Sequence, residues 1–216
     1  TPLTSISGNA GVLMSDGGSL TAEHRNRIYR DIYDDSMWLI NLVENLLSIT
    51  RMEGQGVHLH METELLEEVI DEAMRHINRR HEHHTIKVNQ IGDYILADMD
   101  ARLIIQVITN LVDNAVKYTP EGSTIMVNSR QEGSSAVIDV SDNGPGIPDE
   151  SKEKIFEMFY TTGHKSADGK RGMGLGLPLC RAILSAHRGT IEVLDNKPAG
   201  SIFRLTLPAK EVSLHE

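Results

Sequence analysis

The sequence predicts an α+β protein in which a helical hairpin precedes a domain of mixed sheet and helices. Residues 20–54 carry apolar side chains at helical spacing. Beyond residue 57 short strands and helices interleave, and two strands near 124–142 form a hairpin. With 216 residues and 39% hydrophobic content, the chain can build one large or two modest cores.

The first domain is expected to be a hairpin of two helices over residues 1–56. A short helix at about 2–14 precedes a long one at 20–54, in which Leu39 and Leu46 lie seven residues apart within an apolar stripe. Two helices cannot cover a stripe this wide, so we expect the hairpin to pair with a second copy as a four-helix bundle. The alternative is that the stripe packs against the rest of the same chain.

The second domain is expected over residues 57–210, followed by a tail at 211–216. The expected strands lie at about 57–62, 85–90, 94–98, 124–130, 135–142, 190–195 and 201–208, and the expected helices at 65–80, 101–117 and 175–187. Because hairpins connect neighbouring strands, we expect a largely antiparallel sheet with the helices on one face.

Composition limits the partners and the compartment. The net charge is −10, which makes nucleic acid an unexpected partner. The single cysteine, Cys180, excludes an intrachain disulfide and suits a reducing compartment. No apolar run reaches the roughly eighteen residues that span a bilayer, so we expect membrane attachment only through segments upstream of this chain.

The stretch NLVDNAVKYTP at 110–120 places Asn110, Asn114 and Lys117 on one helical face. Amide oxygens suit Mg²⁺, a hard cation that bridges phosphates, and a lysine suits the phosphates themselves. The alternative is a helix with an ordinary polar outer face.

The stretch SDNGPGIP at 141–148 places Asp142 at the end of a strand, followed by Gly144 and Gly146. A carboxylate there can accept a hydrogen bond from an exocyclic amine, and glycines let the backbone approach a flat ring. The alternative is a simple turn, because the same residues are strong turn formers.

The stretch RGMGLGLPLC at 171–180 places Gly172, Gly174 and Gly176 before a helix. The N–H groups at a helix N-terminus form an anion site. The spacing fits neither the dinucleotide fingerprint nor a P-loop.

The order of these stretches resembles the N, G1, F and G2 boxes of bacterial sensor histidine kinases. The matching residues are Asn110 and Asn114, then Asp142, Gly144 and Gly146, then Phe156 and Phe159, then Gly172, Gly174 and Gly176. In that family the ATP-binding domain has the Bergerat fold, an α/β sandwich shared with gyrase, Hsp90 and MutL. The hairpin at 1–54 is similar to the family's dimerisation and phosphoacceptor domain.

The resemblance implies that ATP and Mg²⁺ are the cofactors. Asp142 would bind the adenine amino group, Asn110 and Asn114 would hold Mg²⁺, and Lys117 would contact phosphate. The remaining expected cofactor-binding residues are Tyr118, Gly144, Gly146, Ile147, Gly172, Gly174, Leu175 and Gly176. For Tyr118, Ile147 and Leu175 a plain core role is the alternative.

The resemblance also implies that the acceptor histidine is absent from this sequence. The family's acceptor motif runs His-Asp/Glu-Leu-Arg-Thr-Pro-Leu, and this sequence begins at Thr1 with Thr-Pro-Leu. Thr1 would take the place of the family's phosphatase-assisting residue, with helix capping as the alternative. His81 begins a His-Glu-x-x-Thr match to the acceptor pattern, but its expected place in the ATP-binding domain argues against that role.

The expected function is therefore that of a protein-histidine kinase region on the cytoplasmic side of the membrane, which by itself would not autophosphorylate. Phosphate would pass from the absent histidine to an aspartate of a cognate response regulator. The segments 1–14 and 179–191 are similar to the potassium-responsive Kdp-type kinases. Met158 stands where many relatives have an arginine, so the alternative is a nucleotide-binding phosphatase or docking dimer without kinase activity. An ATPase of the gyrase or Hsp90 branch would need a glutamate on the 101–117 helix, which has none.

Overall fold

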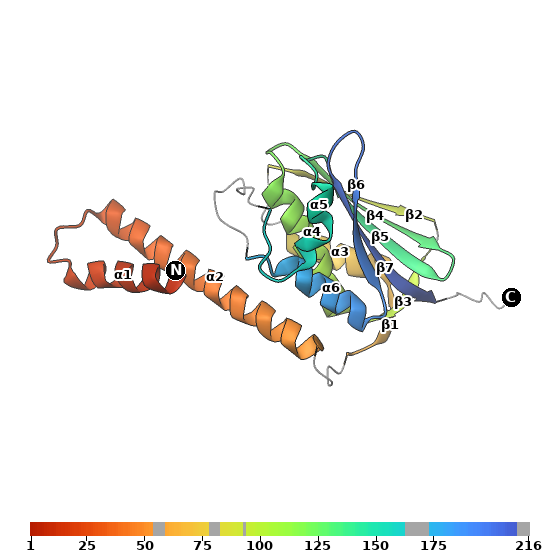
Figure 1. Cartoon of the computed structure of the whole chain (residues 1–216), viewed down its shortest axis with the longest axis horizontal. Coiled ribbons are helices and arrows are strands. Elements are labelled where there is room, and N and C mark those ends of the chain that lie inside the picture. The colour runs from red at the N-terminus through yellow and green to blue at the C-terminus, as the bar shows by residue number, and fades with distance from the viewer. Residues whose placement is uncertain (54–58, 78–82, 93, 163–172, 211–216) are drawn as a thin grey trace. The chain divides into compact units, whose positions relative to one another are not determined.

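The computed structural model describes residues 1–53, 59–77, 83–92, 94–162 and 173–210 (Figure 1). The chain divides into two compact units, Thr1–Ser48 and Ile49–Glu216. Each unit is described by itself below.

The N-terminal unit contains helix α1 (Pro2–Ser15) and most of helix α2 (Ala22–Glu53). Proline suits the first turn of α1 because its missing N–H would have no partner there. The hydroxyl of Thr1 caps the same helix by accepting a hydrogen bond from the Thr4 N–H at 3.3 Å. Large apolar side chains stay exposed along this hairpin: Leu3, Val12, Met14, Tyr29, Tyr33, Met37, Ile40, Val43, Leu46 and Leu47.

The turn between the two helices is organised by one carboxylate. Asp16 Oδ1 accepts hydrogen bonds from the backbone N–H groups of Gly18, Ser19 and Leu20 at 3.1, 2.8 and 3.0 Å. Its other oxygen pairs with the Arg25 guanidinium at 3.0 Å. The pKa of Asp16 is lowered to about 2, chiefly by the Leu20 N–H.

Within the described residues of the C-terminal unit, seven strands form one sheet with the order β1-β3-β7-β5-β4-β2, and β6 pairs with β7. The strands are β1 (Glu62–Leu65), β2 (Thr85–Ile91), β3 (Leu96–Met99), β4 (Thr124–Glu132), β5 (Ser135–Asp142), β6 (Thr190–Asp195) and β7 (Ser201–Lys210). The helices are α3 (Leu66–Ile77), α4 (Ala101–Tyr118), α5 (Asp149–Lys152) and α6 (Gly176–Ala186), with a 3₁₀ turn, η1 (Lys154–Phe156).

Helices α3, α4 and α6 cover one face of this sheet (Figure 1). Apolar side chains of α4 and of the strands beneath it are fully buried between the two layers, among them Ile104, Ile108, Leu111, Ile125 and Ile138. Every strand pair is antiparallel except β2 with β4. The predicted antiparallel sheet with helices on one face is therefore confirmed.

The first strand was predicted in the wrong place. We expected it at 57–62, whereas β1 spans Glu62–Leu65. A strand exists only where a neighbour supplies hydrogen bonds, and β1 pairs with the four residues of β3 in the register Glu62↔Met99. The short elements α5 and η1 were not predicted, because neither is long enough to show a helical period.

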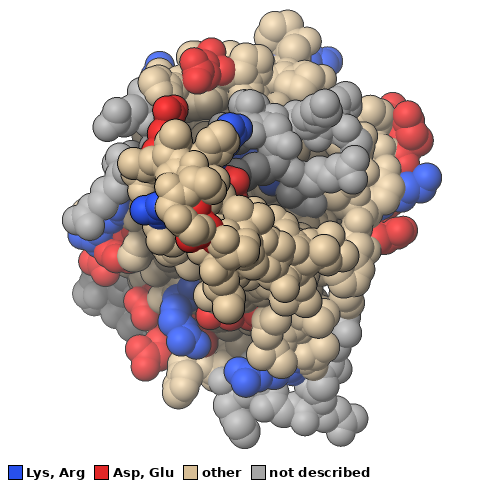
Figure 2. All heavy atoms as spheres, turned by 90° about the vertical axis from the view of Figure 1, so that its left-hand side faces the viewer, with Lys and Arg blue, Asp and Glu red and all other residues tan. Residues whose placement is uncertain are grey.

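The surface mixes charges of both signs. On the face shown in Figure 2, acidic and basic side chains are interspersed around broad uncharged areas.

Among the helices in the described residues, none combines the length and the apolar character that a membrane span requires.

Candidate nucleotide-binding site

The two asparagines of α4 face the start of α6. A Cβ added to Gly176 would lie 3.8 Å from Asn110 Oδ1 and 3.9 Å from Asn114 Nδ2. A Cβ there would make only ordinary contacts, so the start of the α6 backbone lies close to both amides without a clash. The N-terminal end of α6 and the polar face of α4 thus border the same small region.

One polar atom in this region lacks a partner. Asn110 Nδ2 is buried and has no hydrogen-bond partner among the described residues. The neighbouring Cys180 sulfur accepts hydrogen bonds only weakly, so it does not satisfy this N–H group. An unsatisfied buried amide costs about 1–3 kcal/mol, so this atom marks a place where a ligand would improve the hydrogen bonding. Burial raises the pKa of the Cys180 thiol to about 12, which keeps the thiol protonated and unreactive.

The end of α4 supplies a cation and an aromatic ring. Lys117 Nζ lies 5.1 Å from the centroid of the Tyr118 ring, within cation–π range. The Tyr118 side chain remains 38% exposed. Lys117 stands three residues beyond Asn114, so the cation and the amide share one face of the helix.

Asp142 ends β5 and is only 8% exposed. Its Oδ1 accepts the Gly144 N–H at 2.8 Å and the Ser201 N–H at 3.4 Å. No described residue donates to Oδ2. Burial raises the pKa of Asp142, and the Gly144 and Ser201 N–H groups act in the opposite direction. The carboxylate is thus held through one oxygen and offers the other to a donor.

Three residues that hold Asp142 were missed in the sequence. Gly200 adopts φ +115°, and a Cβ there would lie 1.9 Å from the Asp142 carbonyl oxygen. The Asn196 amide donates to that oxygen at 2.7 Å, and Ser201 supplies the N–H described above. The only sequence signal was a glycine directly before the last strand, which does not reveal a partner so distant along the chain.

The glycines after Asp142 serve close backbone contacts. A Cβ on Gly144 would lie 2.6 Å from Thr119 Cγ2 and 2.9 Å from Asp142 Oδ1. Gly146 adopts φ +78° beside the Gly200 carbonyl. Ile147 follows and is half-buried. The stretch is a turn, and the buried carboxylate of Asp142 begins it. A turn and a nucleotide-binding role are therefore compatible at this place.

The glycine run before α6 is described from Met173 onward, and Gly172 lies outside the described residues. Gly174 adopts φ +65°, and its carbonyl accepts the Phe159 N–H at 2.8 Å. A Cβ on Gly174 would lie 2.6 Å from the Tyr160 carbonyl oxygen. Leu175 is fully buried, a burial that fits its alternative role as a core residue.

The sequence also singled out Met158, Thr1 and His81. Met158 is 39% exposed, and the Arg181 guanidinium of α6 lies 4.4 Å from the centroid of the Phe156 ring. Thr1 acts as the α1 cap in the N-terminal unit. His81 lies outside the described residues. His84, three residues further along, has its Nε2 atom 3.1 Å from Thr119 Oγ1.

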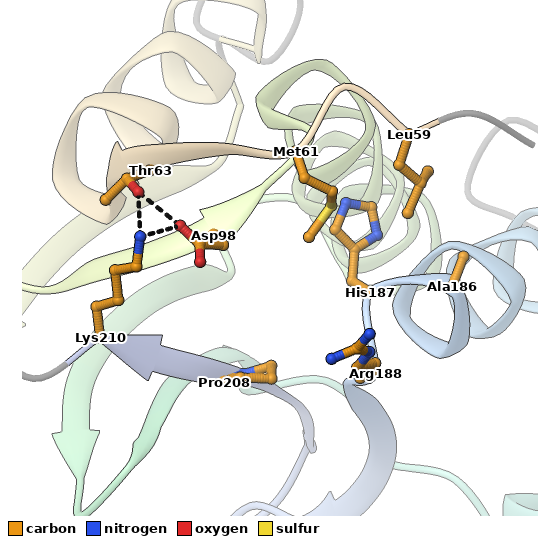
Figure 3. Close-up of a pocket in the computed structure, with 9 residues that line it drawn as sticks. All are labelled: Leu59, Met61, Thr63, Asp98, Ala186, His187, Arg188, Pro208 and Lys210. Carbon is orange, nitrogen blue, oxygen red and sulfur yellow. Dashed lines mark hydrogen bonds and ion pairs between the residues drawn. The ribbon is translucent and has the colours of Figure 1, made fainter.

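A hollow of about 730 Å³ lies at the other end of α6 (Figure 3). Its lining includes Ala186, the last residue of α6, and His187 and Arg188, which follow it. Asp98 of β3 and Lys210 of β7 line it as well. Because α6 is about 16 Å long at 1.5 Å per residue, this hollow is separate from the Gly176 end. None of the expected nucleotide-binding residues lines it.

Comparison with known proteins identifies the family of this arrangement. The family model of histidine kinase-, DNA gyrase B- and HSP90-like ATPases matches residues 99–211, which contain α4, Asp142 and the glycine run. The chain belongs to this family. Its resemblance to bacterial sensor histidine kinases is confirmed by the relatives described next.

Within the histidine kinase-like ATPase family, sensor protein KdpD of Clostridium acetobutylicum is 38% identical over 207 residues, 96% of this chain and 23% of KdpD. The chain thus spans about a quarter of that relative's length. Histidine kinase AdeS of Acinetobacter baumannii superposes with a TM-score of 0.78 at 23% identity, covering 98% of this chain and 96% of AdeS. Histidine kinase ThkA in complex with the response regulator TrrA gives a TM-score of 0.75 at 26% identity, covering 97% of this chain and 58% of that one.

Proposed function

We propose that this chain is the part of a sensor histidine kinase that binds Mg-ATP and presents it to a histidine on a helical bundle. One observation carries the proposal. The three glycine- or amide-bearing stretches meet around the second half of α4: Gly176 lies against Asn110 and Asn114, and Gly144 lies against Thr119, directly after α4. These stretches supply a hydrogen-bonding carboxylate, amide oxygens and helix N–H groups, which suit the three parts of a magnesium nucleotide.

Each part of the ligand has a candidate partner. Asp142 Oδ2 would accept a hydrogen bond from the adenine amino group. Asn110 and Asn114 fit Mg²⁺ because amide oxygens are hard ligands. The unsatisfied Asn110 Nδ2 supports a hydrogen-bond-accepting ligand at the same place. Lys117 and the N–H groups at the start of α6 would contact the phosphates.

Phosphoryl transfer requires alignment and charge neutralisation more than covalent help from the protein. Bound Mg²⁺ would supply part of the neutralisation. The chain's own contribution would be to orient the nucleotide through Asp142 at the end of β5. Asn114 and Lys117, on one face of α4, would fix the phosphate end.

We further propose that residues 1–56 form a homodimer and that a response regulator receives the phosphate. The exposed apolar side chains of the hairpin support the first proposal. The solved complex of ThkA with its response regulator supports the second. We also propose that the parent protein is anchored in the membrane through other segments. The 38% identity to the sensor protein KdpD supports a potassium-responsive sensor.

A second candidate is a nucleotide-binding phosphatase or docking dimer without kinase activity. Met158, in the place where many relatives have an arginine, favours it. Thr1 also favours it, because its hydroxyl lies at the exposed start of α1.

Incubation with labelled ATP tests the proposal. The chain by itself should bind nucleotide and gain no acid-labile, base-stable label, because none of its ten histidines stands in the acceptor context. A version extended upstream through the expected His-Asp/Glu-Leu-Arg should become labelled. Labelling of the unextended chain that His81→Gln abolishes would contradict the proposal. An extended chain that binds ATP but is never labelled would support the second candidate.

A further inference from the structure

Among the described residues, His84 contacts the segment that leads from α4 towards the proposed adenine site. His84 lies in the turn ahead of β2, and two backbone hydrogen bonds flank it. Gly122 N–H donates to the His83 carbonyl at 2.7 Å, and Thr85 N–H donates to the Ser123 carbonyl at 3.0 Å. These bonds fix the turn against the segment that follows α4, so the imidazole is delivered to a defined place.

The imidazole meets Thr119 immediately after α4. His84 Nε2 lies 3.1 Å from Thr119 Oγ1. The Thr119 hydroxyl donates its proton to the Ala115 carbonyl at 2.8 Å. A hydroxyl has one proton to give, so the histidine must be the donor in the contact between them. Thr119 is 3% exposed, and these two bonds fix its side-chain rotamer.

The fixed rotamer places the Thr119 methyl group against the turn that carries Asp142. A Cβ on Gly144 would lie 2.6 Å from Thr119 Cγ2, so that methyl closes one side of the turn. Gly144 in turn donates its N–H to Asp142 Oδ1 at 2.8 Å. The contacts therefore run without a gap from His84 through Thr119 and Gly144 to the carboxylate.

We propose that His84 is a positioning residue for adenine recognition, acting through Thr119 and Gly144 on the orientation of Asp142. The proposal rests on the function proposed above, since it assigns His84 to the same site. If the Thr119 methyl group moves, the Gly144 N–H loses its alignment, and Oδ2 turns away from the place where it would meet the adenine amino group. His84 itself does not touch the nucleotide.

The test compares His84→Ala with His84→Gln, whose side-chain amide keeps an N–H donor at a similar reach. His83→Ala, at the adjacent exposed residue, is the control. Loss of one hydrogen bond should weaken ATP binding roughly 5- to 10-fold in His84→Ala while GTP binding stays unchanged. His84→Gln and the control should remain within about 2-fold of the unmodified chain. Thr119→Ser, which keeps the hydroxyl and loses the methyl group, should behave like His84→Ala.

A second measurement needs no nucleotide. In the free protein, the amide proton of Gly144 should move upfield in His84→Ala and return in His84→Gln, because its hydrogen bond to Asp142 weakens and recovers. An unchanged Gly144 resonance in His84→Ala, or an equal loss of ATP and GTP binding, would overturn the proposal. If the unmodified chain bound no ATP at all, the proposed function would fail, and the Gly144 resonance would still decide whether His84 positions this turn.

Discussion

The backbone of Gly200 lies so close to the backbone of Asp142 that any side chain at position 200 would clash. A Cβ there would lie 1.9 Å from the Asp142 carbonyl oxygen, and the backbone already adopts φ +115°. The turn before β7 therefore packs directly against the backbone at the end of β5, where Asp142 lies.

Gly200→Ala should lower the free energy of unfolding by more than about 2 kcal/mol, because it adds a backbone clash to an unfavourable φ. Gly133→Ala is the matched control, since Gly133 has φ +59° with open space around it, and it should cost only about 1 kcal/mol. Urea denaturation of both variants checks this. Equal losses in the two variants would show that the contact with Asp142 is unimportant.

Asp142→Asn should stabilise the nucleotide-free protein at neutral pH and weaken ATP binding. Burial raises the pKa of Asp142, so ionisation opposes folding. The favourable contribution of the protonated form is complete below the unfolded pKa and is lost as pH rises through the folded pKa. The neutral amide of asparagine avoids that loss of stability. It cannot act as a charged hydrogen-bond acceptor, which should lower the affinity for ATP roughly 10-fold or more. Thermal unfolding and calorimetry would show the opposite effects, and a lower melting temperature would contradict this reasoning.

Asp16→Asn should remove an acid-sensitive part of the stability of the hairpin. The Leu20 N–H, with the Arg25 and Ser19 contacts, lowers the pKa of Asp16 from 3.8 to about 2. Its contribution is present above the unfolded value and is lost as pH falls from about 4 towards 2. The amide proton signals of Ser19 and Leu20 should change over that window and should not do so in Asp16→Asn. Asp31→Asn, at an exposed site on α2, should leave the titration intact.

Replacement of Leu39 and Leu46 by glutamate should yield monomers. Both side chains lie on α2 and are partly exposed in the single chain, so charges there would be buried in the proposed bundle at high cost. Light scattering should show about half the mass of the unmodified protein. Asn41→Glu, at an exposed polar residue of the same helix outside the apolar stripe, should stay dimeric. A double variant of unchanged mass and intact fold would place any dimer surface elsewhere.

The parts of the site that follow a local rule could be predicted from the sequence. Asn110 and Asn114 share a helical face because of the 3.6-residue period, and Asp142 ends its strand because a turn former follows. The support of Asp142 by Gly200 and Ser201 could not be predicted, because it depends on the pairing of β5 with β7. The same limit applies to β1, whose position is set by its partner β3.

The magnesium dependence of nucleotide binding tests the central claim most directly. Calorimetry of the unmodified chain should show that it binds ATP and that Mg²⁺ increases the affinity. The affinity for GTP should be lower. Asn114→Ala should weaken binding and remove most of the magnesium effect, since it deletes a proposed ligand oxygen. Asn89→Ala, on the exposed strand β2, should retain the full effect. An undiminished magnesium effect in Asn114→Ala, or equal binding of ATP and GTP by the unmodified chain, would contradict the account.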